Sequence, residues 1–249
     1  MDIQLLRHAT LVVTVGQRRI LVDPMLSRAE AMEPVANAAV IRRIPMVELP
    51  LNDAALMTLL GQLDLVIVTH THRDHWDSRA IELLRKDLPI LCQPEDVERL
   101  RSDGFTDVHA VDTYVAWDDL TVTRTGGQHG TGEIGQKMGK VSGFIFQAAG
   151  EPRLYIAGDT IWCPSVEAAL ALHRPDIMVV NAGAAQFLTG DPITMSAADV
   201  VQVCRACPET KVVATHMEAI NHCLLTRDGL RSQVRTAGLI DRVIIPADG

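Results

Sequence analysis

The part of this sequence best equipped for chemistry is the segment 69–76, which reads Thr-His-Thr-His-Arg-Asp-His-Trp. It places three imidazoles and one carboxylate within six consecutive positions, 70 to 75. Neutral imidazole is the commonest metal ligand in proteins, and a carboxylate among imidazoles suits zinc, iron or manganese. Clustered imidazoles repel one another once protonated, so such a segment is costly to leave without a metal. The segment therefore predicts a metal site.

Four places along the chain share one pattern, in which an apolar strand-like run is followed by a ligand-type residue. The runs are 65–68, 120–125, 154–157 and 212–214, and the residues that follow them are His70, His129, Asp159 and His216. A lone buried His or Asp is more often a hydrogen-bonded structural group than a ligand. The repetition favours ligands, because neighbouring strand ends converge on one edge of a sheet, where loops carry functional groups.

The elements that must position these residues can be read from apolar periodicity. Short runs at 3–6, 11–15 and 20–22, with a turn at Gly16-Gln17, predict antiparallel sheet. Helices are expected at 53–60, 78–86, 95–101, 164–172, 196–206 and 226–237, and further strands at 89–92, 108–111, 141–148, 177–180 and 242–245. Strands and helices interleave without a linker, so residues 1–249 are interpreted as one α/β domain.

Two segments do not fit this alternation. Residues 24–50 contain four prolines and are expected to form a long surface excursion of the kind that often covers active sites. The glycine-rich stretch 126–135 lacks the Gly-Lys-Ser/Thr ending of a phosphate loop, and no clear helix follows it. A flexible loop that brings the backbone close to the site around His129 is the interpretation here.

The amino-acid composition argues against nucleic acids and membranes as binding partners. With 23 basic against 31 acidic residues the net charge is −8, and no basic block occurs, so general duplex nucleic-acid binding is not expected. No apolar run reaches membrane-spanning length and no signal peptide is visible, which favours a cytoplasmic protein with no membrane partner. The five cysteines are scattered, and the single pair Cys204 and Cys207 is interpreted as ordinary helix residues rather than a redox or zinc motif.

Taken together, HxHxDH at 70–75, a later His in a glycine-rich turn, Gly158-Asp159-Thr160 after a strand and a late His resemble the metallo-β-lactamase superfamily. The resemblance covers essentially the whole chain and implies its α/β fold, a four-layered αββα sandwich. Within the superfamily, the segments Arg7-His8-Ala9-Thr10 and Leu21-Val22-Asp23-Pro24 are similar to the openings of hydrolases related to L-ascorbate-6-phosphate lactonase.

Carried over by position, the resemblance implies a centre of two divalent metal ions, zinc or alternatively manganese or iron. The first ion would be held by His70, His72 and His129, the second by Asp74, His75 and His216, and Asp159 would bridge them beside a water or hydroxide. Such ions would lower the pKa of the water and polarise the group that it attacks. Three His or Asp ligands per ion leave room for substrate.

Several further residues are candidates for this site. Asp74 is expected to orient the nucleophile and accept its proton, and His222 is a candidate for substrate contact or proton transfer, with a structural role equally open. Asp23 would fix a ligating imidazole or simply make a turn. His8 and Trp76 are candidates for the pocket, each with plain packing as the alternative.

The resemblance implies a metal-dependent hydrolase of a small molecule, in which metal-bound hydroxide opens or cleaves a lactone, ester, amide or phosphodiester. One alternative is a nucleotide or nucleic-acid phosphodiesterase, which would ordinarily need a basic track. Another is an iron-dependent oxidoreductase, although the flavin-linked di-iron branch has Glu where this chain has His72. A third is a non-catalytic binding protein, but such members tend to lose ligands and here every position is filled. If the lactonase resemblance holds, a homo-oligomer is an option.

Overall fold

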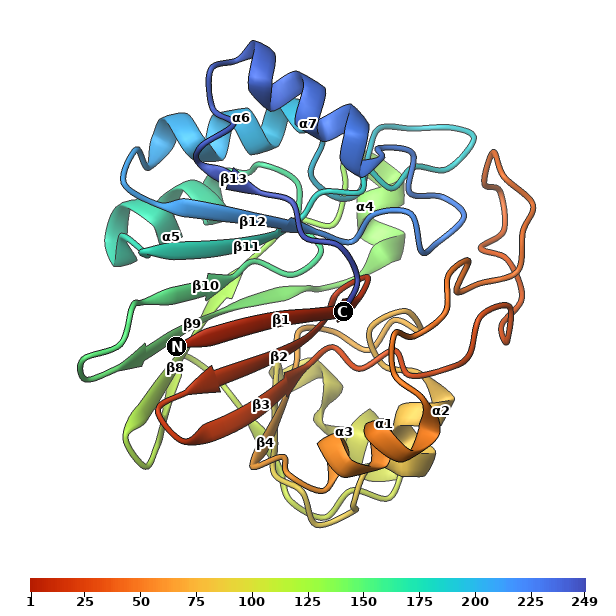
Figure 1. The fold of residues 1–249 in the computed structure, drawn as a ribbon, viewed down its shortest axis with the longest axis vertical. Coiled ribbons are helices and arrows are strands. Elements are labelled where there is room, and N and C mark those ends of the chain that lie inside the picture. The colour runs from red at the N-terminus through yellow and green to blue at the C-terminus, as the bar shows by residue number, and fades with distance from the viewer.

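Two β-sheets pack face to face in the computed structural model, which describes all residues 1–249 (Figure 1). Each sheet follows chain order, with β1 to β6 in one and β7 to β13 in the other. The first sheet comprises β1 (Asp2–Arg7), β2 (Thr10–Val15), β3 (Arg18–Val22), β4 (Leu65–Val68), β5 (Ile90–Cys92) and β6 (Val108–Ala110). The second comprises β7 (Tyr114–Trp117), β8 (Leu120–Gly126), β9 (Ser142–Ala148), β10 (Leu154–Ile156), β11 (Ile177–Asn181), β12 (Lys211–Thr215) and β13 (Val243–Ile244).

Helices cover the outer face of each sheet. The first sheet carries α1 (Asp53–Leu60), α2 (Ser78–Leu83), η1 (Pro94–Asp96) and α3 (Val97–Ser102), and the second carries α5 (Pro164–His173), α6 (Ala197–Ala206) and α7 (Arg227–Thr236). Side chains alternate between the layers along β4: Leu65 and Ile67 enter the core between the sheets, whereas Val66 packs under the helices. The predicted four-layered αββα sandwich is therefore confirmed.

The directions of the strands determine which strand ends lie together at one edge of the sandwich. Strands β3 to β6 are mutually parallel, as are β10 to β13, while β1 and β8 run the same way through antiparallel neighbours. Parallel strands buried on both faces need continuous apolar runs, as in Leu65–Val68 with all four residues buried. As a result, the carboxyl ends of β1, β3, β4, β8, β10, β11 and β12 all lie at one edge of the sandwich.

The excursion 24–50 contains no helix or strand and lies at this same edge, at the right of Figure 1. Its base is held by Arg7, a fully buried guanidinium that donates to the carbonyls of Met25, Ser27 and Val47 at 2.7, 2.8 and 3.1 Å. Its middle is held by the buried side chain of Asn221, which bonds to the backbone of Val35 and Val40. The excursion is thus a fixed part of the wall around the edge.

Most predicted elements occur within a few residues of their expected limits, and α6 begins with a capping box between Ser196 and Asp199. Two elements differ. The glycine-rich stretch contains a short helix, α4 (Gly132–Met138), where none was expected. A Cβ at Gly135 would lie 2.6 Å from the carbonyl oxygen of Gly130, so the glycines allow a tight approach that propensity alone does not suggest. Strand β7, on the sheet edge, was not expected either.

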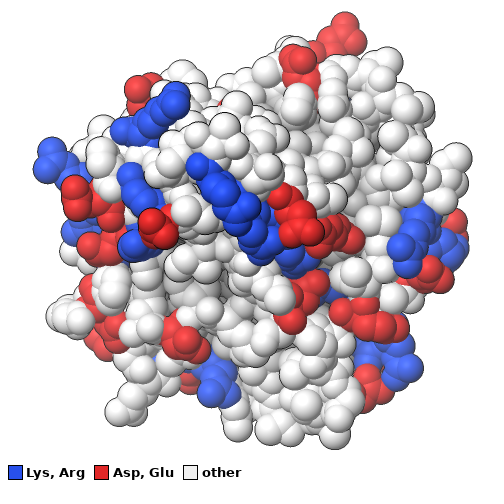
Figure 2. All heavy atoms as spheres, turned by 45° about the horizontal axis from the view of Figure 1, so that its top comes forward, with Lys and Arg blue, Asp and Glu red and all other residues white.

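Charged side chains on the surface are intermixed. Figure 2 shows one face, on which Lys and Arg lie beside Asp and Glu rather than in a basic track. Exposed pairs such as Arg18 with Asp119 and Arg79 with Asp53 illustrate the pattern. No helix of the protein is both long and apolar enough to span a bilayer.

Candidate metal centre

The ligand-type residues predicted from the sequence meet at the edge formed by the strand ends. One group consists of His70 and His72 after β4 with His129 after β8, and its ligand atoms lie within 4.8 Å of one another. His70 Nε2 is 3.0 Å from His72 Nδ1. The order of nitrogens follows from spacing, because residues two apart on an extended segment need different ring atoms to reach one point.

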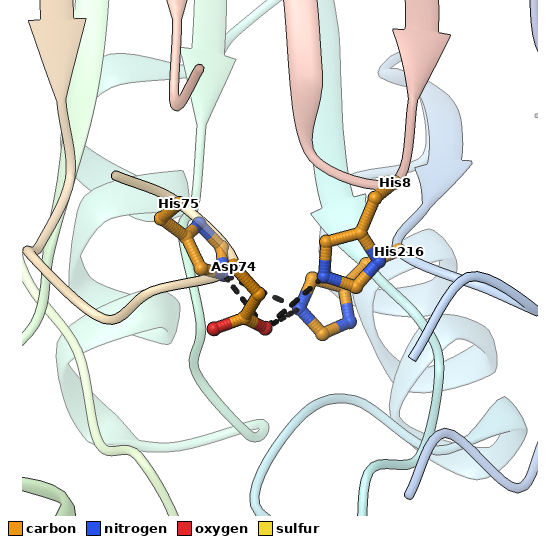
Figure 3. Close-up of side chains that lie close together, drawn as sticks. All are labelled: His8, Asp74, His75 and His216. Carbon is orange, nitrogen blue, oxygen red and sulfur yellow. Dashed lines mark hydrogen bonds and ion pairs between the residues drawn. The ribbon is translucent and has the colours of Figure 1, made fainter. Parts of the chain in front are cut away.

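A second group lies beside the first and contains Asp74, His75, His216 and, in addition, His8 (Figure 3). The Nε2 atoms of His75 and His216 are 3.3 Å apart. Oδ2 of Asp74 lies 3.2 Å from Nε2 of His8 and 3.6 Å from Nε2 of His216. Asp74 is the member nearest to solvent, with 13% of its side chain exposed.

Asp159 lies between the two groups. Its Oδ2 is 3.2 Å from His75 Nε2 and 3.5 Å from His129 Nε2, and its Oδ1 is 3.3 Å from His216 Nε2. The carboxylate therefore reaches ligands of both groups, as expected of a bridging ligand. All seven residues that the sequence assigned to metal binding are brought together.

The hydrogen bonds behind the imidazoles test whether this set fits a metal. His75 Nδ1 is 2.9 Å from Asp23 Oδ2, His129 Nδ1 donates to the carbonyl of Ile193 at 2.7 Å, and His70 Nδ1 is 3.1 Å from Thr69 Oγ1. An imidazole that donates outward from Nδ1 presents the Nε2 lone pair to the centre. Facing lone pairs 3 Å apart repel unless a proton or a metal ion lies between them, so the donor set fits metal ions that replace those protons.

Asp23 is the buried support that the sequence proposed as one of two options. Besides His75, it accepts from the backbone N–H of Thr69 at 2.8 Å and from the Thr69 hydroxyl at 2.7 Å. It thereby fixes the beginning of the ligand segment as well as one ligand.

Asn181 and Cys223 support the centre without having been predicted. Asn181, at the end of β11, donates from Nδ2 to Asp159 Oδ1 at 2.6 Å and accepts from the Thr215 hydroxyl at 3.0 Å. The Sγ of Cys223 lies 3.5 Å from Nδ1 of His216. A polar residue ending the apolar run 177–180 was a signal for Asn181, whereas nothing in the sequence pointed to Cys223.

Burial and neighbouring charges set the protonation of these groups in the metal-free chain. Burial lowers the pKa of His8 to about 3 and that of His222 to about 4. Burial also disfavours charge on His75, but Asp159, Asp23 and Asp74 outweigh it and raise the pKa to about 10. For Asp159, His216 and His75 overcome burial and hold the carboxyl pKa well below its usual range. The carboxyl pKa of Asp74 is lowered in the same way, by His75, His216 and His8. Both carboxylates, of Asp159 and of Asp74, are thus ionised and able to bind cations.

A cavity of about 230 Å³ opens onto this centre. Its floor contains His72, Asp74, His129 and Asp159, with His222 at the side. Its walls are largely apolar and come from two loops and α4, namely Val35, Ala36, Met138, Phe187 and Ile193. Arg73 lies at its mouth and is exposed. The arrangement suits a small molecule with an uncharged, apolar group.

The remaining predicted site residues are placed as follows. His222 lines the cavity, and its buried Nδ1 has no hydrogen-bond partner in the protein. His8 is fully buried beside Asp74, and its ring centroid lies 3.6 Å from that of His216, with the two ring planes tilted by 37°. Trp76 is not brought to the centre: it packs against Phe105 in the core under the helices and donates to Asp103 at 2.9 Å. It turns away because it begins the segment that leads into α2.

Comparisons with known proteins agree with this geometry. Residues 18–217 match the family model described as the beta-lactamase superfamily domain. The UPF0173 protein YddR of Bacillus subtilis is 35% identical over 100% of this chain and 98% of its own length. The UPF0173 metal-dependent hydrolase Ta0764 of Thermoplasma acidophilum is 26% identical over 68% of this chain and 65% of its own.

Two solved structures are similar over nearly their whole length. The isothiocyanate hydrolase from Delia radicum gut bacteria has 38% identity and a TM-score of 0.94, covering 100% of this chain and 97% of that one. A possible metal-dependent hydrolase from Veillonella parvula has 35% identity and a TM-score of 0.95, covering 99% and 97%. This chain therefore belongs to the metallo-β-lactamase superfamily and, within it, to the UPF0173 family of metal-dependent hydrolases.

Proposed function

We propose that this hydrolase converts small isothiocyanates, R–N=C=S, into a primary amine and carbonyl sulfide. The observation that carries the proposal is the small cavity over the ligand cluster, whose walls are largely apolar apart from His222 at the side and Arg73 at the mouth. The solved isothiocyanate hydrolase, 38% identical over the full chain, supports the same substrate class. We further propose that the centre binds two metal ions, of zinc, manganese or iron, with Asp159 between them.

The dimensions of the cavity favour this class of substrate. Ligand pockets commonly measure roughly 300–1,000 Å³, and the volume of about 230 Å³ here lies below that range. An isothiocyanate is linear and uncharged, and its reactive carbon lies one atom from the substituent. The reactive group can therefore reach the floor while the substituent lies against Phe187, Val35 and Met138.

The reaction balances without any further reactant. Water adds across the C=N bond to give the thiocarbamic acid R–NH–C(=S)–OH, and a proton shift from oxygen to sulfur gives its tautomer R–NH–C(=O)–SH. The C–N bond then breaks as the S–H proton moves to nitrogen, which releases the amine R–NH₂ and carbonyl sulfide. When bound, metal ions supply a water of lowered pKa and polarise the substrate. In this chain Asp74 lies at the floor of the cavity and is placed to accept the proton of the water.

His222 is placed to contact the leaving nitrogen. Burial lowers its pKa to about 4, so at neutral pH the ring is uncharged and keeps one N–H donor and one acceptor. Its Nδ1 is buried and makes no hydrogen bond within the protein. Nε2, which is not among the fully buried atoms and makes no hydrogen bond within the protein, is the ring nitrogen that a substrate in the cavity would contact.

Lactone opening, suggested by the segments 7–10 and 21–24, is the second candidate. The structure gives these residues tasks that do not depend on a lactone, since Arg7 holds the excursion and Asp23 supports His75. The same centre would polarise a lactone carbonyl equally well. Lactones therefore belong in the test beside isothiocyanates.

The test is an assay of the purified enzyme loaded separately with zinc, manganese or iron(II), in buffer without thiols. We expect release of amine and carbonyl sulfide, measured by chromatography, from allyl and 2-phenylethyl isothiocyanate. Asp74→Asn should abolish turnover, and the exposed, unbonded Asp112→Asn serves as the matched control. Turnover of a lactone or of bis-p-nitrophenyl phosphate without any amine release would refute the proposal.

A further inference from the structure

The loop that follows β12 contains both a metal-ligand candidate and an unusual partner for it. His216 begins this loop with a left-handed backbone, φ 65°, and its N–H donates to the carbonyl of His8 at 2.8 Å. Its Nε2 faces the centre, 3.3 Å from Asp159 Oδ1. Nδ1 therefore carries the ring proton, and the Sγ of Cys223, 3.5 Å away, is in place to accept it.

The surrounding backbone holds the sulfur in this position. The N–H of Cys223 donates to the carbonyl of Ile220 at 3.1 Å, and Cys223 forms an antiparallel bridge with Ala185. A Cβ at Gly183 would lie 2.2 Å from the carbonyl oxygen of His216 and 2.9 Å from the sulfur. Only a glycine lets the segment after β11 close over both residues.

His216 differs from the other inward-facing imidazoles in its partner. His75, His129 and His70 have oxygen partners, in a carboxylate, a carbonyl and a hydroxyl. Sulfur is a weak acceptor, but no other acceptor in the protein contacts Nδ1 of His216. Loss of the sulfur would leave a buried N–H without a partner and remove the contact that sets the rotation of the ring.

We propose that Cys223 is a positioning residue, whose sulfur orients His216 so that Nε2 is available to a metal ion. Partners of this kind typically change metal affinity by about 10–100-fold when they are removed. The inference concerns the affinity of the centre for metal, so it stands or falls independently of the proposed isothiocyanate substrate.

The experiment compares Cys223→Ala and Cys223→Ser with Cys207→Ala, a control that also removes a cysteine sulfur bonded to a side chain, the Thr210 hydroxyl. Zinc affinity is measured by competition with a chromophoric chelator, and the coordination geometry by the visible spectrum of the cobalt(II) form. We expect Cys223→Ala to lose about 10–100-fold in affinity and to show an altered cobalt spectrum. Cys223→Ser, whose hydroxyl also accepts, should recover most of both, and the control should match the wild type.

Packing is separated from hydrogen bonding by Cys223→Val, which fills the space but offers no acceptor. Melting of the metal-free variants shows which of them fold. If Ala fails to fold, the comparison of Val with Ser decides in its place. Wild-type zinc affinity and an unchanged cobalt spectrum in a folded Ala or Val variant would overturn the proposal, as would a folded Ser variant no better than them.

Discussion

At the scale of single residues, the centre depends on what lies behind each ligand. An imidazole has two nitrogens, and which one is free for a metal is decided by the hydrogen bond that the other makes. Asp23 decides this for His75, and the carbonyl of Ile193 decides it for His129. The supports are as buried as the ligands, because exposure to water would offer the outer nitrogen competing partners.

Asp23→Ala should weaken the centre and the fold together. The change removes three hydrogen bonds, to His75 and to both the backbone and the hydroxyl of Thr69. We expect zinc affinity to fall about 10–100-fold and the free energy of unfolding of the metal-free protein to fall by about 1–3 kcal/mol. Chelator competition and urea unfolding measure the two effects. Asp2→Ala, at an exposed position, should change neither.

Metal uptake should release protons. The pKa of His75 is raised to about 10, and that of His216 lies well above its usual value because Asp159 outweighs burial. Both rings are therefore doubly protonated in the metal-free chain at pH 7, and a metal must displace a proton from each. Affinity should rise with pH towards 10 and weaken on acidification. Calorimetry of zinc binding in two buffers of different ionisation enthalpy counts the protons, and a buffer-independent heat would contradict the expectation.

At the scale of elements, the side chain of Asn221 ties the excursion 24–50 to the late ligand loop, beside a backbone hydrogen bond from Met46 to Ala219 and a small apolar cluster. Asn221 is buried, accepts from the N–H of Val35 at 2.8 Å, and donates to the carbonyls of Val35 and Val40 at 3.1 and 2.7 Å. Val35 is also part of the cavity wall. The loop that supplies His216 therefore also shapes the cavity in which the substrate binds.

Asn221→Ala should loosen this cover. The backbone groups of Val35 and Val40 would lose their partners, but Val35 is only half-buried and Val40 is exposed, so water replaces part of the loss and the cost stays at or below about 1 kcal/mol for each group. We expect faster tryptic cleavage at Arg42 and Arg43, followed by mass spectrometry, and a higher KM with a smaller change in kcat. Gln202→Ala, exposed on α6, is the control. Cleavage at the wild-type rate would show that other contacts hold the excursion.

The sequence was informative about elements where periodicity and burial agree. The strands from β4 to β12 that carry the ligands were predicted because they are apolar runs ending in His or Asp. Helix α4 was not, because glycine lowers helix propensity while its value here lies in close approach to Gly130. The supporting roles of Asn181 and Cys223 were not predicted, for different reasons. Cys223 is defined by a partner on the far side of a turn, and no local pattern encodes that contact, whereas Asn181 ends an apolar run but is neither His nor Asp, the residue types that the pattern was read for.

At the scale of the whole molecule, the two sheets each supply part of the centre. His70, His72, Asp74 and His75 follow a strand of the first sheet, whereas His129, Asp159 and His216 follow strands of the second. Because ions bind only the folded arrangement, they stabilise it by mass action. The parallel strands of both sheets are buried on their two faces, and because they run in the same direction their carboxyl ends also bring the ligand residues together.

Removal of metal should therefore lower the melting temperature of the whole protein. At a free zinc concentration of 100 times Kd, each independent site adds about 2.7 kcal/mol. We expect EDTA to lower the Tm by several degrees and zinc to restore it. Asp159→Asn, which weakens the bridge between the groups, should show a smaller shift. Differential scanning calorimetry with and without metal makes the comparison, and equal melting curves would contradict it.

The order of strands has a consequence for biosynthesis. Because β1 to β6 and β7 to β13 are each built from one continuous stretch of chain, the ribosome synthesises every strand of the first sheet before any strand of the second. The nascent first half already contains four of the ligand residues, yet its apolar face awaits the second half, which also brings Asp159. Cofactor insertion is accordingly a late event, and cells starved of the metal would accumulate a finished polypeptide rather than a stalled one.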